Sequence, residues 1–187
     1  DIALMRAIPN MQVIVPADYY EAKAVIKAVA EIEGPAFIRL GRPAVPMIFD
    51  EKHKFIFGKA HKHKDGKDVT IFATGIMVKP SLDAAEILGQ EGIDVEVISL
   101  STLKPIDEEA ILTSAGKTHA VVTAEEHSII GGLGSAVAEV LGENLPTRMK
   151  RVGIKDVFGC SGSVLELLKH YGLTAEDLAV AAKEILN

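Results

Sequence analysis

The stretch from Asp68 to Leu100 constrains the fold more than any other part of the sequence. Val69 to Ala73 is a short apolar run rich in β-branched and aromatic residues, and another apolar run begins at Val95. Between the two runs, apolar residues recur at helical spacing, namely Val78, Leu82, Ala85 and Leu88. The pattern predicts a strand, a helix and a second, parallel strand joined by a right-handed crossover. Because both runs are almost continuously apolar, we expect helices on both faces of the sheet.

A similar unit precedes this one. Residues 12–15 and 36–40 are predicted strands, and Asp18 with Glu21 has the spacing of a capping box at the start of the helix between them. Glu21 is expected on the solvated side of that helix. The expected buried face consists of Ala22, Val25, Ile26, Val29 and Ile32. The second strand ends in the sequence Gly41-Arg42-Pro43.

Residues 43–67 are predicted to be a linker with at most one edge strand, and the shift in composition makes them the best candidate for a domain boundary. Residues 55–57 form a short apolar run, and residues 61–67 are interpreted as a charged turn. His61 and His63 alternate as a metal-binding pair on a strand does. Without a third ligand, a solvated loop is the preferred interpretation of these two histidines.

The later part of the chain repeats the alternation of strands and helices. Ala120 to Thr123 and Met149 to Ile154 are predicted strands, and the helix between them is expected to bury Val137, Val140 and Leu141. Helix starts are predicted from the N-cap patterns at Asp107, at Ser163 with Glu166, and at Thr174 with Asp177.

Composition limits the kinds of binding partner and the cellular compartment that we expect for this protein. The net charge is −6 and no basic run is present, which argues against nucleic acid as the main partner. The single cysteine, Cys160, excludes an internal disulfide and is expected to be a small packed residue rather than a nucleophile. No apolar stretch is long enough to span a bilayer, so we expect a cytoplasmic protein without membrane contact. The chain begins at Asp1 without a methionine, which suggests a piece of something longer.

Three stretches follow predicted strands and are candidate sites, because ligands of open α/β sheets bind at the carboxyl ends of strands. They are Gly41-Arg42, Thr74-Gly75 and Glu125-Glu126-His127. Arg42 offers a guanidinium to a carboxylate or phosphate, and a structural ion pair is an equally good interpretation. For the Glu125 to His127 stretch, an interface or a surface loop is preferred over an acid–base cluster. Close packing of a helix on the sheet is preferred over anion binding for the glycines Gly132 and Gly134.

Five stretches together resemble the transketolase family, and most closely the carboxyl-terminal subunit of split transketolases. They are residues 6–22, 34–43, 68–78, 91–107 and 125–141. The resemblance runs nearly from end to end. It implies an α/β fold in which residues 1–50 are the tail of a pyrimidine-binding domain with a parallel sheet. Residues 60–187 would be a transketolase carboxyl-terminal domain, with a mostly parallel mixed sheet covered by helices on both faces.

The resemblance also implies a function. Complete members use thiamine diphosphate and Mg²⁺ to transfer a two-carbon ketol unit between sugar phosphates, and their active sites lie between subunits. We therefore expect an N-terminal transketolase subunit or domain as a partner and a homodimer as the assembly. Arg42 matches the arginine that binds the substrate phosphate in the family. The residues that bind and activate the cofactor precede Asp1 or belong to another domain, so the resemblance assigns no catalytic, cofactor-binding or metal-binding residue to this chain.

Two other functions stay open at this stage. The second interpretation is that the segment is part of a deoxyxylulose-phosphate synthase, a relative of transketolase, and it is distinguished by whether the complete protein takes pyruvate or a ketose phosphate as donor. A non-catalytic assembly or regulatory module, as in a complex like the 2-oxoacid dehydrogenases, is the third interpretation. In each case we expect the isolated segment to be inactive, because it lacks the groups that hold and deprotonate the cofactor.

Overall fold

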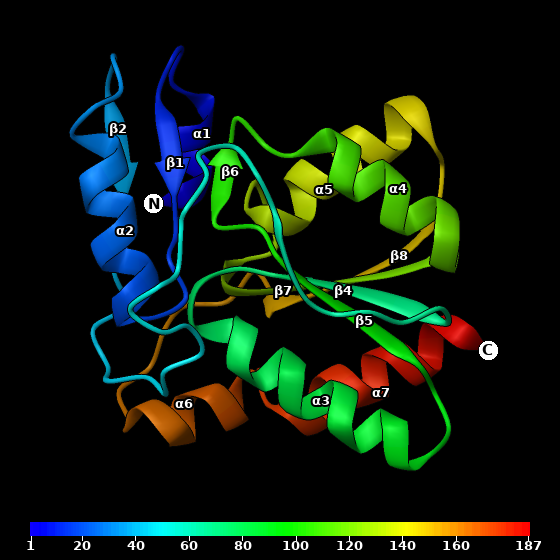
Figure 1. The fold of residues 1–187 in the computed structure, drawn as a ribbon. Coiled ribbons are helices and arrows are strands. Elements are labelled where there is room, and N and C mark those ends of the chain that lie inside the picture. The colour runs from blue at the N-terminus through cyan, green and yellow to red at the C-terminus, as the bar shows by residue number, and fades with distance from the viewer.

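The computed structural model describes residues 1–187 and contains a large and a small β-sheet (Figure 1). The five-stranded sheet has the order β3-β5-β4-β7-β8. Its strands are β3 (His61–Lys64), β4 (Val69–Ala73), β5 (Val95–Ser99), β7 (Ala120–Ser128) and β8 (Arg148–Ile154). All neighbours pair in parallel except β3, which is antiparallel to β5. The predicted parallel crossover between β4 and β5 is therefore confirmed.

Helices cover both faces of the five-stranded sheet, as expected for strands that are apolar throughout (Figure 1). One face packs against α3 (Val78–Gln90), which follows a short 3₁₀ turn, and α7 (Ala175–Leu186). The other face packs against α4 (Glu108–Thr118) and α5 (Leu133–Asn144). Side chains of β4 alternate between the two layers, since Ile71 belongs to the first core and Phe72 to the second.

The small sheet joins early and late parts of the chain. β1 (Gln12–Ile14) pairs in parallel with β2 (Ala36–Ile38) and antiparallel with β6 (Thr102–Lys104). α1 (Ile2–Ala7) and α2 (Tyr19–Val29) lie beside this sheet (Figure 1). The division of the chain into residues 1–50 and 60–187 stays a prediction. A strand from the later part completes the sheet of the earlier part.

The predicted helix starts agree with the observed hydrogen bonds. The Asp18 carboxylate accepts from the Glu21 amide at 2.9 Å, and Asp107 likewise caps α4. Reciprocal capping boxes open α6 (Val164–His170) and α7. No helix combines the length and apolar character needed to cross a bilayer.

Two local predictions are wrong. Glu21 is buried, because its carboxylate accepts from the Ala17 amide at 2.7 Å and the Ser101 hydroxyl at 2.6 Å, whereas Ile26 on the same helix is exposed. The edge strand lies at His61–Lys64, inside the segment interpreted as a charged turn. A charged segment suits this position, because an edge strand is exposed to water along one side. Its lysine side chains stay solvated while its backbone pairs with β5 on the other side.

Candidate functional site

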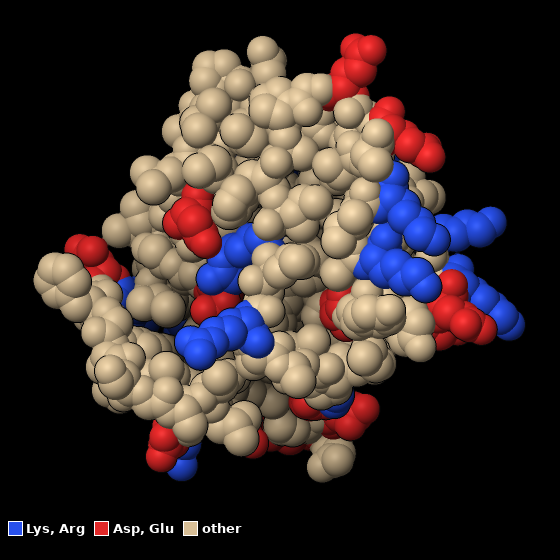
Figure 2. Space-filling model, turned by 90° about the vertical axis from the view of Figure 1, so that its left-hand side faces the viewer, with Lys and Arg blue, Asp and Glu red and all other residues tan.

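A cleft of about 790 Å³ lies between the end of β2 and α6. One wall consists of residues 39–43, which follow β2, and the opposite wall includes the loop before α6 and α6 itself. On the face shown in Figure 2, basic and acidic side chains lie together beside a hollow. The chain therefore brings the candidate residue Arg42 to a solvent-accessible concave surface.

Arg42 and its neighbour Arg39 line the same cleft but differ in their electrostatic surroundings. The Arg39 guanidinium donates to the Glu126 carboxylate at 2.7 Å and to the Asp1 carboxylate at 3.1 Å. Arg42 is exposed, and none of the hydrogen bonds or ion pairs of the chain involves its side chain. Two carboxylates thus offset the charge of Arg39, whereas the charge of Arg42 faces the cleft without an internal partner.

Sequence reasoning did not single out Arg39. It lies three positions before Arg42 in the same stretch, and the two residues have the same chemistry. The only available signal was the presence of a second arginine near the strand end, which does not indicate whether a carboxylate lies nearby.

The Glu125 to His127 stretch is not a surface loop, because these residues form part of β7, and a role at an interface stays a prediction. Glu125 is fully buried, and its carboxylate accepts from the backbone amides of Leu133 and Gly134, both at 2.8 Å. It thereby binds the amino-terminal end of α5, where unpaired N–H groups favour a negative charge. The role of this carboxylate in the chain is structural.

The glycines at the start of α5 permit close approach to this helix end. A Cβ atom at Gly132 would lie 1.8 Å from Glu125 Oε2, and one at Gly134 would lie 2.7 Å from Arg151 Cδ. The preferred interpretation of close packing is confirmed. An external anion has no access to the amides of Leu133 and Gly134, because the carboxylate of Glu125 already accepts from them.

The candidate stretch Thr74-Gly75 is also a place of close packing. Gly75 has a φ of +56°, and a Cβ atom there would lie 2.9 Å from Val15 Cγ1. Thr74 is buried, and its hydroxyl donates to the Val15 carbonyl at 3.4 Å. Glycine is required here by the left-handed backbone and by the contact between the two sheets.

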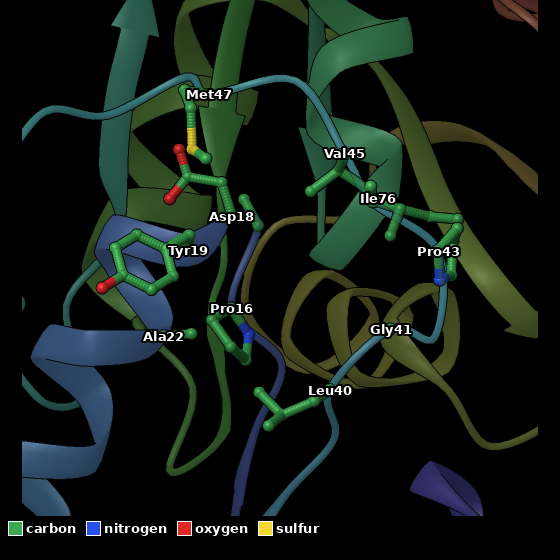
Figure 3. Close-up of a pocket in the computed structure, with 12 residues that line it drawn as sticks. Pro16, Asp18, Tyr19, Ala22, Leu40, Gly41, Pro43, Val45, Met47 and Ile76 are labelled. Atoms are coloured by element: carbon green, nitrogen blue, oxygen red, sulfur yellow. The ribbon is translucent and has the colours of Figure 1, made fainter.

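A second, apolar pocket of about 360 Å³ is lined in part by the loop that carries Arg42 (Figure 3). Tyr19 and Ala22 of α2, Met47 and Ile76 contribute to its lining. The residues Leu40, Gly41 and Pro43 line both the pocket and the cleft. The loop therefore contributes both to an apolar pocket and to a cleft that contains two arginines.

His61 and His63 do not lie in a solvated loop, so that interpretation is wrong. Together with His53 they surround the ring of Phe49, with ring centroids 3.7 Å from His53, 5.0 Å from His61 and 5.1 Å from His63. Burial, and secondarily the charges of the other two histidines, lowers the pKa of His63 to about 4. No group of three or more His, Cys, Asp or Glu side chains has a geometry suited to a metal ion.

Cys160 was expected to be packed, but its thiol is exposed on the loop before α6. The expectation failed because small residues around a cysteine indicate close packing only when the segment enters the core. This loop stays at the surface. Cys160 Sγ lies 3.4 Å from the Tyr171 hydroxyl, and both residues line the cleft that contains Arg42.

Comparison with known protein families gives two matches in the order of the chain. The family described as transketolase, pyrimidine binding domain matches residues 1–47. The family described as transketolase, C-terminal domain matches residues 58–178.

Individual proteins agree with these matches. A putative transketolase C-terminal section of Methanocaldococcus jannaschii is 51% identical over 96% of this chain and 57% of its own length. A 6-deoxy-6-sulfo-D-fructose transketolase subunit of a Clostridium species is 49% identical over 99% of the chain and 58% of its own length. A 1-deoxy-D-xylulose-5-phosphate synthase of Heliobacterium modesticaldum is 38% identical, and the match covers the whole chain and 29% of that protein. The chain thus spans somewhat more than half of the first two relatives.

A solved structure is similar over almost the whole chain. It is described as a split gene transketolase, inactive beta4 tetramer, and superposes with a TM-score of 0.94 at 53% identity. The similarity covers 99% of this chain and 60% of the other.

Proposed function

This chain belongs to the transketolase family, as the carboxyl-terminal portion of a transketolase-family protein, and we propose that Arg42 binds the anionic end of its sugar substrate. In the complete protein this binding serves the transfer of a two-carbon ketol unit between sugar phosphates. The segment contributes substrate binding and scaffolding, and the reacting groups belong to the remainder of the protein.

The observation that carries this proposal is the difference between the two arginines of the cleft. Asp1 and Glu126 offset the charge of Arg39, whereas Arg42 has no carboxylate partner in the chain. A guanidinium presents a planar fork of N–H donors that matches phosphate oxygens in pairs. An anionic ligand in the cleft gives Arg42 the partner that the chain itself does not provide.

The names of the relatives support an anionic substrate without fixing the sugar. One relative is named for a sulfonated fructose, and another, from Phocaeicola vulgatus, for apulose 4-phosphate. A sulfonate and a phosphate both offer oxygen atoms to a guanidinium. We propose that the substrate bound by this chain is a sugar phosphate. A role of the complete protein in the pentose phosphate pathway is one consequence to be tested.

The residues of this chain do not by themselves fit thiamine diphosphate and Mg²⁺. The glycine-rich start of α5 holds the carboxylate of Glu125 in place of a diphosphate, and the side chains form no group suited to a metal ion. The cofactor would bind in the complete protein, which we propose pairs this segment with an N-terminal subunit or domain and assembles as a homodimer.

A 1-deoxy-D-xylulose-5-phosphate synthase is the second candidate, since a relative of that name matches the whole chain at 38% identity. The two candidates differ in the donor that the complete protein accepts. Product formation from pyruvate with a triose phosphate favours the synthase, and product formation from a ketose phosphate favours transketolase.

The role of Arg42 is tested by Arg42→Ala in the complete enzyme, assayed with a phosphorylated sugar and with its unphosphorylated analogue. A hydrogen-bonded contact to a charged group contributes about 2–3 kcal/mol, so KM for the phosphorylated sugar should rise on the order of 30- to 150-fold. KM for the analogue should change little. An equal rise for both sugars would show that Arg42 is structural.

A further inference from the structure

The two walls of the cleft come from distant parts of the chain. Arg42 lies on the wall that follows β2, and Gly159, Cys160 and Ser163 lie on the opposite wall. α6 continues that opposite wall and lies below α2 in Figure 1. A ligand bound to Arg42 in the cleft therefore has residues of this loop as its other neighbours.

The loop before α6 has little internal support. Residues 155–163 are exposed, and no residue of α6 is buried. Phe158 is completely exposed, so the loop has no apolar anchor at this position. Its conformation depends on the few hydrogen bonds that it makes.

Tyr171, the residue that follows α6, supplies the hydrogen bonds of the loop up to Gly162, whereas Ser163 is bonded to Glu166 at the start of α6. The Tyr171 hydroxyl accepts from the backbone amide of Cys160 at 2.9 Å. It lies 3.3 Å from the carbonyl oxygen of Phe158 and 3.4 Å from the thiol of Cys160, and its proton is donated to one of them. Every hydrogen bond that residues 156–162 make involves this hydroxyl.

We propose that residues 158–163 form the closing wall of the anion cleft and that Tyr171 is the positioning residue that holds this wall opposite Arg42. The inference rests on the proposed function of Arg42 and deepens it. The ligand class is a sugar with a terminal phosphate or sulfonate. A wall in this position excludes water from one side of the anion, and the attraction between guanidinium and anion increases as the surrounding water is displaced.

The thiol of Cys160 allows the closing wall to be tested without measuring enzyme activity. Iodoacetamide alkylates an exposed thiol, and the tryptic peptide of residues 156–169 contains this cysteine, so mass spectrometry follows its labelling in the full-length protein with its partner subunit. Ribose 5-phosphate is the probe, and ribose is the uncharged control. At a concentration about ten times its Kd, a ligand that covers the thiol slows alkylation about tenfold.

We expect ribose 5-phosphate to protect Cys160 in the unaltered protein and not in Arg42→Ala, and ribose to have no effect at the same concentration. Equal labelling with and without ribose 5-phosphate would overturn the closing wall. The KM values of Arg42→Ala test the proposed function separately. A higher KM for the phosphorylated sugar without protection of Cys160 supports phosphate binding by Arg42 and contradicts only the closing wall. Protection that persists in Arg42→Ala also overturns the inference.

The role of Tyr171 is tested with Tyr171→Phe, which keeps the ring and removes the hydroxyl. Loss of these hydrogen bonds should raise KM for ribose 5-phosphate on the order of five- to tenfold, with kcat and the KM for ribose little changed. Tyr20→Phe is the matched control, since the Tyr20 hydroxyl makes no hydrogen bond and does not line the cleft. A purely structural role would lower Tm without separating the two sugars, and that outcome contradicts the positioning role.

Discussion

The buried carboxylate of Glu125 gives a direct test of how the amino-terminal end of α5 is stabilised. Glu125→Ala removes the acceptor of two backbone amides, those of Leu133 and Gly134. A buried donor left without a partner costs about 1–3 kcal/mol, so the free energy of unfolding should fall by about 2–6 kcal/mol. Glu125→Gln keeps one carbonyl oxygen for one amide and should lose about half as much, roughly 1–3 kcal/mol.

The measurement is urea unfolding followed by circular dichroism, and Glu126→Gln is the matched control. The Glu126 side chain is 32% exposed and pairs with Arg39, whose side chain is 21% exposed. A partly exposed ion pair of this kind contributes about 0–1 kcal/mol. Equal losses for Glu125→Gln and Glu126→Gln would refute the argument, as would a loss below about 1 kcal/mol for Glu125→Ala.

Two further predictions concern pH and the cofactor. Because burial lowers the pKa of His63 from 6.5 to about 4, the folded state disfavours its protonation. Stability should therefore fall as pH decreases through this range, and His63→Gln should reduce the slope of the urea midpoint against pH, whereas an unchanged slope would contradict the prediction. The isolated residues 1–187 should not bind thiamine diphosphate with Mg²⁺ in a calorimetric titration, and micromolar binding would show that the residues required for it are present here.

Predictions from local signals agree well with the structure. The crossover of β4, α3 and β5 follows from hydrophobic periodicity within a few turns and strands. The capping box of Thr174 and Asp177 joins residues three positions apart, so it forms wherever the helix starts. The family resemblance adds the carboxyl-terminal position of the segment, which the family comparisons support.

Predictions about individual polar residues agree less well. Glu21 has the spacing of a solvated helix residue, yet the hydroxyl of Ser101, 80 positions away, donates to its carboxylate in a buried contact. Nothing in the charged sequence of residues 61–64 indicates that this segment forms a strand by pairing with β5. Both errors have one cause, since the partner that decides the outcome is distant in sequence.

The sequence by itself determined the α/β class, the order of the central elements and the helix starts, because backbone propensity, periodicity and capping act over a few residues. Only the tertiary structure distinguished Arg39 from Arg42. The carboxylates that offset the charge of Arg39 lie 38 and 87 positions away, at Asp1 and Glu126. Neutralisation of a charge depends on distances across the folded chain, and no pattern around a single arginine contains that information.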